Sequence, residues 1–308
     1  MKINNSIKGM LLRFFSRETT LKLNHPVAEL NRRNARSELG NVPLDYFARQ
    51  TKLVRDRLIH NLRDSSNSQL CNFLSDPEYS TLGERVVEYG WIGQKLIALK
   101  GEAKRPKILD VGCVMNNLIV TELVLDTCEF IWLMNPSPEH IAYAERAAYI
   151  LADPRKHFLP DGLKFDIVTC LSTLEHVGMN NVRYGGERGP VTRDTSHPEE
   201  HAKALLPSLW DLTAPGGQLC LSVPFGPFEY LFSPGDPDPI YYTYDEERLL
   251  NLISALEGQV HSVDIQIYKV IPGHGWVATD IKDKEILPQA VNCVGAGGTA
   301  LVTFRRKE

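Results

Sequence analysis

The sequence predicts an α/β fold with a seven-stranded, mostly parallel sheet, flanking helices, an antiparallel C-terminal strand pair and an N-terminal helical extension. Two observations predict it. From Lys107 onward, short apolar runs typical of strands alternate with helix-like segments, which is the pattern of parallel strands joined by crossover helices. The last two apolar runs follow each other without a strong helical segment between them, so they are expected to pair in antiparallel orientation.

The expected strands are short apolar runs bounded by turn-forming or charged residues. They are Lys107–Val111, Glu129–Met134, a short one near Ala148–Leu151, Phe165–Leu171, Gln218–Val223, His261–Val270 and Thr299–Arg305. The helices expected between them begin after Asn116 and after Pro138, and cover Pro198–Leu212 and Asp245–Leu256.

Before residue 100 the chain shows helical periodicity and little strand signal. Helices are expected over Leu44–Leu62 and Leu82–Leu99, separated by a polar loop near residues 64–68. We therefore expect residues 1–81 to form the helical extension and residues 82–308 to form the main domain.

Residues 5–17 are expected to form an amphipathic helix that docks on another surface, because its apolar face is too large to remain in water. This face consists of Ile7, Met10, Leu11, Phe14 and Phe15. This face could dock on the main domain, on a second subunit or on an anionic membrane. The sequence is therefore compatible with a homo-oligomer and with a peripheral membrane contact. Only three cations flank the face, which favours a protein surface.

Charge and cysteine usage restrict the class of protein. The formal net charge is −4, which gives no reason to expect nucleic acid as a partner. Residues 1–64 carry 13 Lys and Arg against 6 Asp and Glu, a balance of +7, so the remainder carries −11. The six cysteines include no Cys-x-x-Cys pair, several lie in apolar runs, and neither a secretory signal nor a membrane span is visible. We expect a cytoplasmic protein with reduced thiols.

The strongest local motif is Lys107-Ile-Leu-Asp-Val-Gly-Cys113, an apolar strand that ends in an acid and a glycine. In open α/β sheets, ligands bind beyond the carboxyl ends of the strands, and a glycine there allows close approach of the backbone. Asn135 ends the second strand about 25 residues after Asp110, and Asp153 follows the third. The fourth strand runs from Phe165 into Ser172-Thr-Leu-Glu-His176, and a Pro-Gly-Gly turn precedes the fifth.

With these motifs, residues 107–225, and more loosely 82–308, resemble class I S-adenosylmethionine (SAM)-dependent methyltransferases. The resemblance is strongest to bacterial members with a segment like Ser172-Thr-Leu-Glu-His-Val-Gly178 followed by Tyr184-Gly185. It implies a Rossmann-like fold, SAM as the cofactor and methyl transfer. The cofactor-binding residues that it implies are Asp110, Gly112 and Cys113 in the first motif, near the methionine part of SAM, Asn135 at the ribose, Asp153 at the adenine amino group, and Leu171 and Ser172 lining the cofactor.

The resemblance favours O-methylation of a saccharide or another small-molecule hydroxyl, with Glu175 and His176 as candidate catalytic residues. A histidine with a near-neutral pKa suits deprotonation of a hydroxyl; an alternative role for the pair is to order the loop. Two departures from the family pattern leave a second function possible, that of a non-catalytic scaffold with the same fold. Val114-Met-Asn-Asn117 replaces further glycines, and Asn135 stands where an acid is usual. A lipid, quinone or amine acceptor also stays open.

Two further features lie near this expected site. The long polar segment from Arg183 to Glu200 contains Asp194, His197 and His201, which could ligate a metal, but an ordinary helix start at Pro198 is the favoured interpretation. We therefore expect no metal. Some aromatic rings after the fifth strand are expected to line an acceptor pocket. The rings are Phe225, Phe228, Tyr230, Phe232, Tyr241, Tyr242 and Tyr244.

Overall fold

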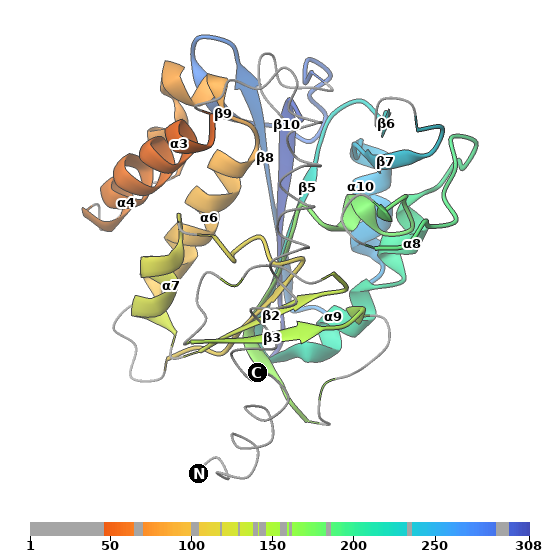
Figure 1. The fold of residues 1–308 in the computed structure, drawn as a ribbon, viewed down its shortest axis with the longest axis horizontal. Helices are drawn as coiled ribbons and strands as arrows, with labels where there is room; N and C mark the ends of the chain where they lie inside the picture. Colours follow the sequence, from red (N-terminus) through yellow and green to blue (C-terminus); the bar gives the residue numbers. More distant parts are fainter. Residues whose placement is uncertain are drawn as a thin grey trace.

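The fold is seen in a computed structural model (Figure 1). The model describes residues 46–64, 70–99, 105–117, 119–128, 130–137, 141, 146–154, 159, 162–182, 186–232, 236–287 and 296–308. The expected amphipathic helix of residues 5–17 and the helix expected after Pro138 lie outside the described residues.

One eight-stranded sheet forms the centre of the protein, in the order β3-β2-β1-β4-β5-β10-β8-β9. The five strands from β3 to β5 are mutually parallel, whereas β10 is antiparallel to both β5 and β8. The bounds of the strands are β1 Ile108–Val111, β2 Ile131–Asn135, β3 Ala147–Leu151, β4 Phe165–Leu171, β5 Thr213–Pro224, β8 Ser262–Ile271, β9 Gly275–Thr279 and β10 Gly298–Arg305.

The seven expected strands and the antiparallel C-terminal pair are thereby confirmed, and with them the Rossmann-like plan. The expected number of strands was wrong by one, because β9 adds an eighth strand at the edge, antiparallel to β8. This strand is short and follows a tight turn, so its sequence lacks a strong strand pattern. Buried Trp276 stabilises it, since the ring is 0% exposed and its Nε1–H donates to the Leu82 carbonyl at 3.2 Å.

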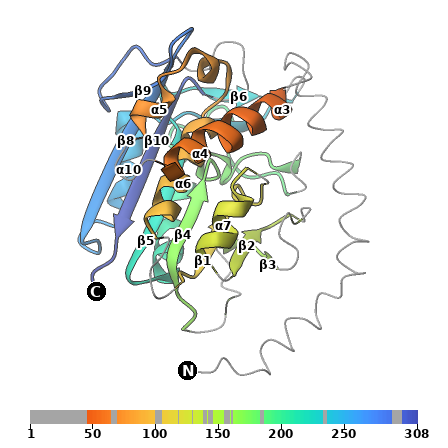
Figure 2. The ribbon, with the colours of Figure 1, turned by 90° about the vertical axis from the view of Figure 1, so that its left-hand side faces the viewer.

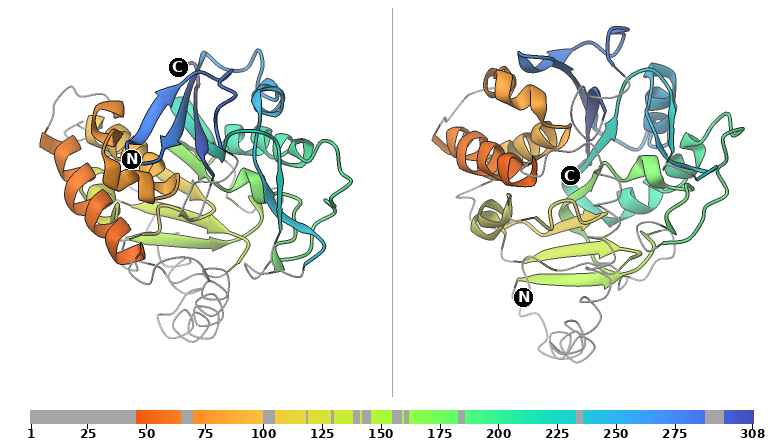
Figure 3. Two further views of the ribbon diagram at one scale, coloured as in Figure 1. Left: turned by 90° about the horizontal axis from the view of Figure 1, so that it is seen from above. Right: turned by 45° about the horizontal axis from the view of Figure 1, so that its top comes forward.

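Helices cover both faces of the sheet. The first face packs against the helices of residues 46–99 and α7 (Thr121–Thr127), which lie together in Figure 2. The opposite face packs against α8 (Glu199–Lys203), α9 (Leu206–Leu212) and α10 (Glu246–Ser254). Figure 3 shows the two sets on opposite sides of the sheet. The elements of residues 46–99 are α3 Tyr46–Thr51, η1 Lys52–Ile59, α4 His60–Asp64, α5 Cys71–Leu74, η2 Pro77–Thr81 and α6 Arg85–Ala98.

The expected helices that fall within the described residues are present with altered boundaries. The segment expected over Leu44–Leu62 is helical from Tyr46 to Asp64, with a π-helical middle, η1, for which the sequence offers no cause. The helix expected over Pro198–Leu212 is divided into α8 and α9. None of the described helices combines the length and apolar character needed to span a membrane.

The aromatic-rich segment after β5 forms a small antiparallel sheet of β6 (Tyr230–Phe232) and β7 (Pro239–Tyr242). Phe225, Tyr242 and Tyr244 are at most 2% exposed and belong to the core on the α8–α10 side. The Tyr242 hydroxyl donates to the Tyr244 hydroxyl at 2.5 Å. These three rings therefore pack in the core, and Phe228, Tyr230, Phe232 and Tyr241 keep exposed surface.

Candidate functional site

The order in which the chain adds strands to the sheet reverses between β1 and β4. The chain adds β2 and β3 on one side of β1, then crosses over to add β5 beyond β4. A crevice at the carboxyl ends of the strands forms at such a switch point, and this is where open α/β sheets bind their ligands. The candidate site therefore lies after Val111 and Leu171, which end β1 and β4.

Backbone strain is concentrated at this switch point. Cys113 and Ser172 are the two residues other than glycine with positive φ in the described part of the chain, at 58° and 34°. Such conformations cost about 1–3 kcal/mol each and persist where the surrounding structure enforces them, often at functional sites. The turns after β1 and β4 are thus held in strained conformations next to each other.

Gly112 joins these two turns. Its φ is +90°, and a Cβ built there would lie 2.0 Å from Thr173 Oγ1. Its N–H donates to the Met134 carbonyl on β2 at 2.9 Å. Only glycine fits this position, because both its backbone conformation and the contact with Thr173 exclude a side chain.

Asp110 orders the first turn from inside the protein. The side chain is 0% exposed, and its two oxygens accept hydrogen bonds from the Met115 N–H and the Thr169 hydroxyl, each at 2.7 Å. Burial raises the pKa of Asp110 to about 6. Its contact with the methionine part of SAM stays a prediction, whereas its role in shaping the turn is direct.

The other expected cofactor residues lie on the same edge of the sheet. Asn135 is the last residue of β2, and Asp153 follows β3 by two positions; both are partly exposed. The Ala152 N–H donates to the Asn135 carbonyl at 3.1 Å, which joins the two strand ends. Leu171 is fully buried at the end of β4. The fold thus brings the ends of all four strands together, as the motif spacing predicts.

Glu88 on α6 is a member of this site that the sequence analysis missed. Its Oε1 accepts hydrogen bonds from the hydroxyls of Ser172 and Ser222, the latter at 2.6 Å, and Arg85 donates to its Oε2 at 2.6 Å. Glu88 is 0% exposed. The one available signal was a carboxylate between apolar neighbours in α6, because buried glutamates need partners.

Glu175 lies in the 3₁₀ helix η4 (Leu174–His176) directly after the strained turn, and it is 2% exposed. Its Oε2 has no hydrogen-bond partner among the described residues. Burial raises the pKa of Glu175 well above its usual range, against the lowering effect of Arg85. Burial at this position therefore favours the protonated, neutral form of the carboxyl.

His176 has a defined tautomer. Its Nδ1–H donates to the Ile240 carbonyl at 2.8 Å, which leaves a lone pair on Nε2, 3.8 Å from Glu175 Oε1. The Tyr241 ring packs beside the imidazole, with ring centroids 5.6 Å apart. Burial lowers the pKa of His176 to about 4, so the ring is neutral at pH 7.

Glu84, at the start of α6, provides a test of these electrostatics. Burial, and then the charge of Glu88, raises the pKa of Glu84 from 4.5 to about 7. The folded state therefore holds a proton that the unfolded state loses above pH 4.5, so this group destabilises the fold progressively as pH rises from 4.5 through 7. Glu84→Gln is expected to raise the free energy of unfolding at pH 8 and change it little at pH 4.5, as measured by urea titration.

In this test the glutamine carbonyl can still accept the hydrogen bond from the Ala296 N–H, which Glu84 Oε2 accepts at 3.0 Å. Glu247→Gln, on the exposed side of α10, is the matched control and should have no such pH dependence. An equal effect of Glu84→Gln at both pH values would contradict the raised pKa.

The three residues considered for a metal serve other contacts or remain at the surface. Helix α8 begins at Glu199, directly after Pro198, and His197 Nδ1 lies 3.1 Å from Glu199 Oε1. The His201 ring packs against Gly178, and Asp194 is exposed. Within the described ranges, no group of three or more potential metal ligands comes together. An ordinary helix start is therefore confirmed here, although the helix begins at Glu199 and Pro198 takes the N-cap position expected for Ser196 or His197.

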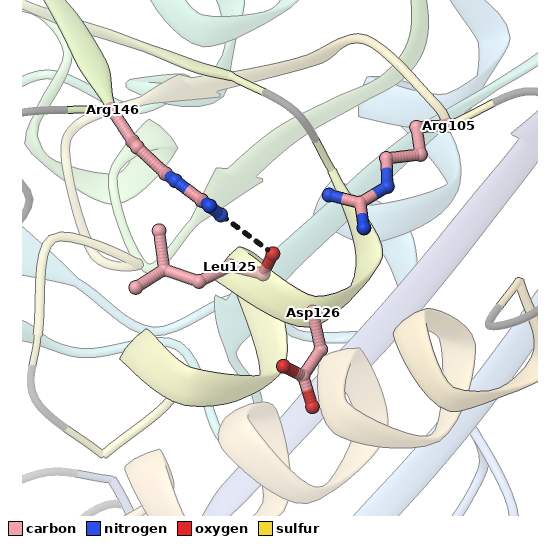
Figure 4. Close-up of a pocket in the computed structure, with 4 residues that line it drawn as sticks. All are labelled: Arg105, Leu125, Asp126 and Arg146. Carbon is pink, nitrogen blue, oxygen red and sulfur yellow. Dashed lines mark hydrogen bonds between the residues drawn. The ribbon is translucent and has the colours of Figure 1, made fainter.

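A hollow of about 580 Å³ lies at the amino ends of the strands, and Figure 4 shows the four residues that line it. Arg105 precedes β1 and Arg146 precedes β3, while Leu125 and Asp126 belong to the end of α7. Arg146 donates to the Leu125 carbonyl at 3.0 Å. The hollow faces the amino ends of the strands, away from the switch point, so we do not assign the cofactor to it.

No protein-family model and no curated protein matches the chain. Among solved structures, the fold is similar to that of 1,6-didemethyltoxoflavin-N1-methyltransferase from Burkholderia thailandensis, bound to S-adenosylhomocysteine (15% identity, 69% of this chain and 76% of that chain, TM-score 0.43). It is also similar to the N-methyltransferase NodS from Bradyrhizobium japonicum with S-adenosylhomocysteine (13% identity, 83% and 99%, TM-score 0.40). A third is a SAM-dependent methyltransferase from Mesorhizobium loti (16% identity, 69% and 96%, TM-score 0.39). These TM-scores lie below 0.5, so the function has to be inferred from this chain's own residues.

Proposed function

We propose that this protein is an enzyme that transfers a methyl group from SAM to a small-molecule acceptor. The observation that carries the proposal is the pair of strained turns at the switch point, formed by Gly112 and Cys113 after β1 and by Ser172 after β4. Their place at the carboxyl ends of β1 and β4 is where this kind of sheet binds a nucleotide-like ligand. The same residues belong to the sequence motifs on which the resemblance to SAM-dependent methyltransferases rests.

The residues at this edge fit the chemistry of SAM. Asn135 is partly exposed and its amide can both donate to and accept from ribose hydroxyls. Asp153 is partly exposed and its carboxylate can accept from the adenine amino group. Bound SAM supplies a methyl group on a sulfonium. Leu171 and Ser172 would line this cofactor, and the network through Glu88 holds Ser172 in place.

Methyl transfer is an in-line displacement, so alignment of the acceptor atom with the methyl group supplies much of the rate. Rigid turns serve this purpose, and Ser172 is fixed by Glu88 and by its N–H, which donates to Ser222 Oγ at 3.0 Å. His176 is the candidate base for a hydroxyl of a saccharide or another small molecule, because the bond to Ile240 places the ring N–H on Nδ1 and makes Nε2 the basic nitrogen. A cytoplasmic location and a role in polysaccharide or natural-product biosynthesis remain part of this proposal.

Asp153→Ala is expected to weaken SAM and S-adenosylhomocysteine binding by about 1–3 kcal/mol, the usual cost of leaving a buried polar partner unpaired. Isothermal titration calorimetry measures this directly. Asp211→Ala, at an exposed position on α9, is the control and should bind like the parent. No binding of either ligand to the parent protein at millimolar concentration would favour the alternative of a non-catalytic scaffold.

The pH dependence of turnover tests the role of His176. Its folded pKa of about 4 lies below the ordinary 6.5, so the ring stays neutral well below pH 6.5 and gains a proton only as pH falls toward 4. Turnover that depends on this ring should therefore stay level between pH 6 and 8 and fall only near pH 4. A kcat profile of the parent and of His176→Asn tests this. An inflection near pH 6.5 that disappears in His176→Asn would mean that the ring titrates normally.

A further inference from the structure

The hollow beside α7 is lined by two arginines that precede β1 and β3. Ile131, at the start of β2, pairs with Ile108 of β1 on one side and with Ala147 of β3 on the other. Arg105 lies three residues before Ile108, and Arg146 lies directly before Ala147. The parallel register therefore brings both arginines to the amino ends of the same three strands.

Both guanidinium groups point into the hollow. In Figure 4 they come from opposite sides and point toward each other. Arg146 is held in this orientation, because it donates to the Leu125 carbonyl at 3.0 Å. Arg105 has no hydrogen bond or ion pair with another residue in the described ranges. Burial raises the pKa of the Cys128 thiol to about 11, and the charges of both arginines act against this rise, so both lie near the same thiol.

The carboxylate among the described lining residues does not neutralise the two arginines. In Figure 4 the side chain of Asp126 points away from both guanidinium groups, and its Oδ2 lies 3.6 Å from Nη2 of Arg63 on α4. Two like charges that face a common space repel each other, and an anion between them is attracted to both. An anionic ligand is therefore what this arrangement favours.

We infer that this hollow binds a phosphate group. A guanidinium presents its N–H donors in a planar fork that matches the spacing of two phosphate oxygens. Arg146 uses one of its five donors on Leu125, so the two arginines together keep enough donors for the three terminal oxygens of a phosphate monoester. Such a group carries close to two negative charges at pH 7, one for each arginine, whereas a carboxylate carries one.

The size of the hollow favours a phosphate group that belongs to a larger molecule. Its volume of about 580 Å³ falls within the usual range of about 300–1,000 Å³ for small-molecule sites, and the five heavy atoms of phosphate fill only part of it. The hollow lies at the amino ends of the strands, whereas the candidate cofactor site lies at their carboxyl ends. It is therefore a second ligand site, and the inference does not depend on the proposed methyl transfer.

Isothermal titration calorimetry of the full-length protein tests this site. The probes are glucose 6-phosphate and inorganic phosphate, in a phosphate-free buffer at constant ionic strength. We expect glucose 6-phosphate to bind with a Kd of about 1 mM or lower, and Arg105→Gln to weaken this binding at least about 10-fold, or about 1.4 kcal/mol. Arg105→Gln removes no contact with the described residues, so the variant should fold like the parent.

Two substitutions of Arg146 separate its charge from its shape. Arg146→Gln should weaken binding as much as Arg105→Gln does. Arg146→Lys keeps the charge and loses the planar fork, so it should bind more weakly than the parent and more tightly than Arg146→Gln. Lys282→Gln is the control, because it removes one positive charge at an exposed position after β9, at the far edge of the sheet from β3, and it should bind like the parent.

The two probes distinguish the sources of phosphate. Tighter binding of glucose 6-phosphate supports the site with a phosphorylated small molecule as its ligand, and equal affinity supports it with free phosphate. Binding of neither probe would overturn the site. So would binding that both glutamine variants retain, or that Lys282→Gln weakens equally, because phosphate would then bind elsewhere or respond only to net charge. None of these outcomes bears on the methyltransferase proposal, whose test is the binding of SAM at the other ends of the strands.

Discussion

Gly112→Ala is expected to abolish detectable SAM binding and to destabilise the fold by about 2–5 kcal/mol. The positive φ costs an alanine about 1–2 kcal/mol, and overpacking against Thr173 costs about 1–3 kcal/mol more. Since a Cβ would lie 2.0 Å from Thr173 Oγ1, the turns after β1 and β4 have to move apart. Urea titration measures the stability and calorimetry the SAM affinity.

The chain offers a matched control for this substitution. Gly258 has a similar φ of +76°, but no atom lies within 4 Å of a Cβ built there. Gly258→Ala should therefore show only the cost of the backbone conformation and should leave SAM binding intact. Adding Thr173→Ala to Gly112→Ala should recover part of the lost stability, because it removes the two nearest atoms. Equal effects of the two glycine variants would mean that contact with Thr173 is unimportant.

Glu88→Ala is expected to lower the free energy of unfolding by about 1–3 kcal/mol, the usual cost of leaving buried polar partners unsatisfied, because Glu88 is fully buried whereas Arg85 is 31% exposed and can still be solvated. The substitution leaves Arg85 without its carboxylate and the hydroxyls of Ser172 and Ser222 without their acceptor. Because Ser172 is held in a strained conformation, SAM affinity should fall as well. Thermal and urea unfolding, together with calorimetry, test both effects.

Glu88→Gln separates the two roles of this side chain. Its carbonyl can still accept from the two serines, so SAM affinity should stay near that of the parent, whereas the lost charge opposite Arg85 should still lower stability. Near-parental stability of Glu88→Ala would show that water or another acceptor replaces the carboxylate.

The seven strands could be predicted because each is a continuous apolar run with turn residues at its ends, and parallel strands buried on both faces have this pattern. β9 could not be predicted in the same way. It is a short edge strand stabilised by Trp276 and by pairing with β8, and neither contact is visible as a local pattern. The boundary at residue 81 stays a prediction, although the helices of residues 46–99 and the sheet share one core.

The sequence by itself determined that the candidate site residues lie at the ends of β1, β2, β3 and β4, because each motif directly follows an apolar strand and the carboxyl ends of parallel strands lie at the same edge of the sheet. Gly112, Asn135, Asp153 and Ser172 were proposed in this way. Only the tertiary structure decided the surroundings of the site, because Glu88 reaches Ser172 from 84 positions away in the chain. It also decided the directions in which the pKa values of Glu175 and His176 shift, since a pKa depends on burial and on neighbouring charges, which folding alone brings together.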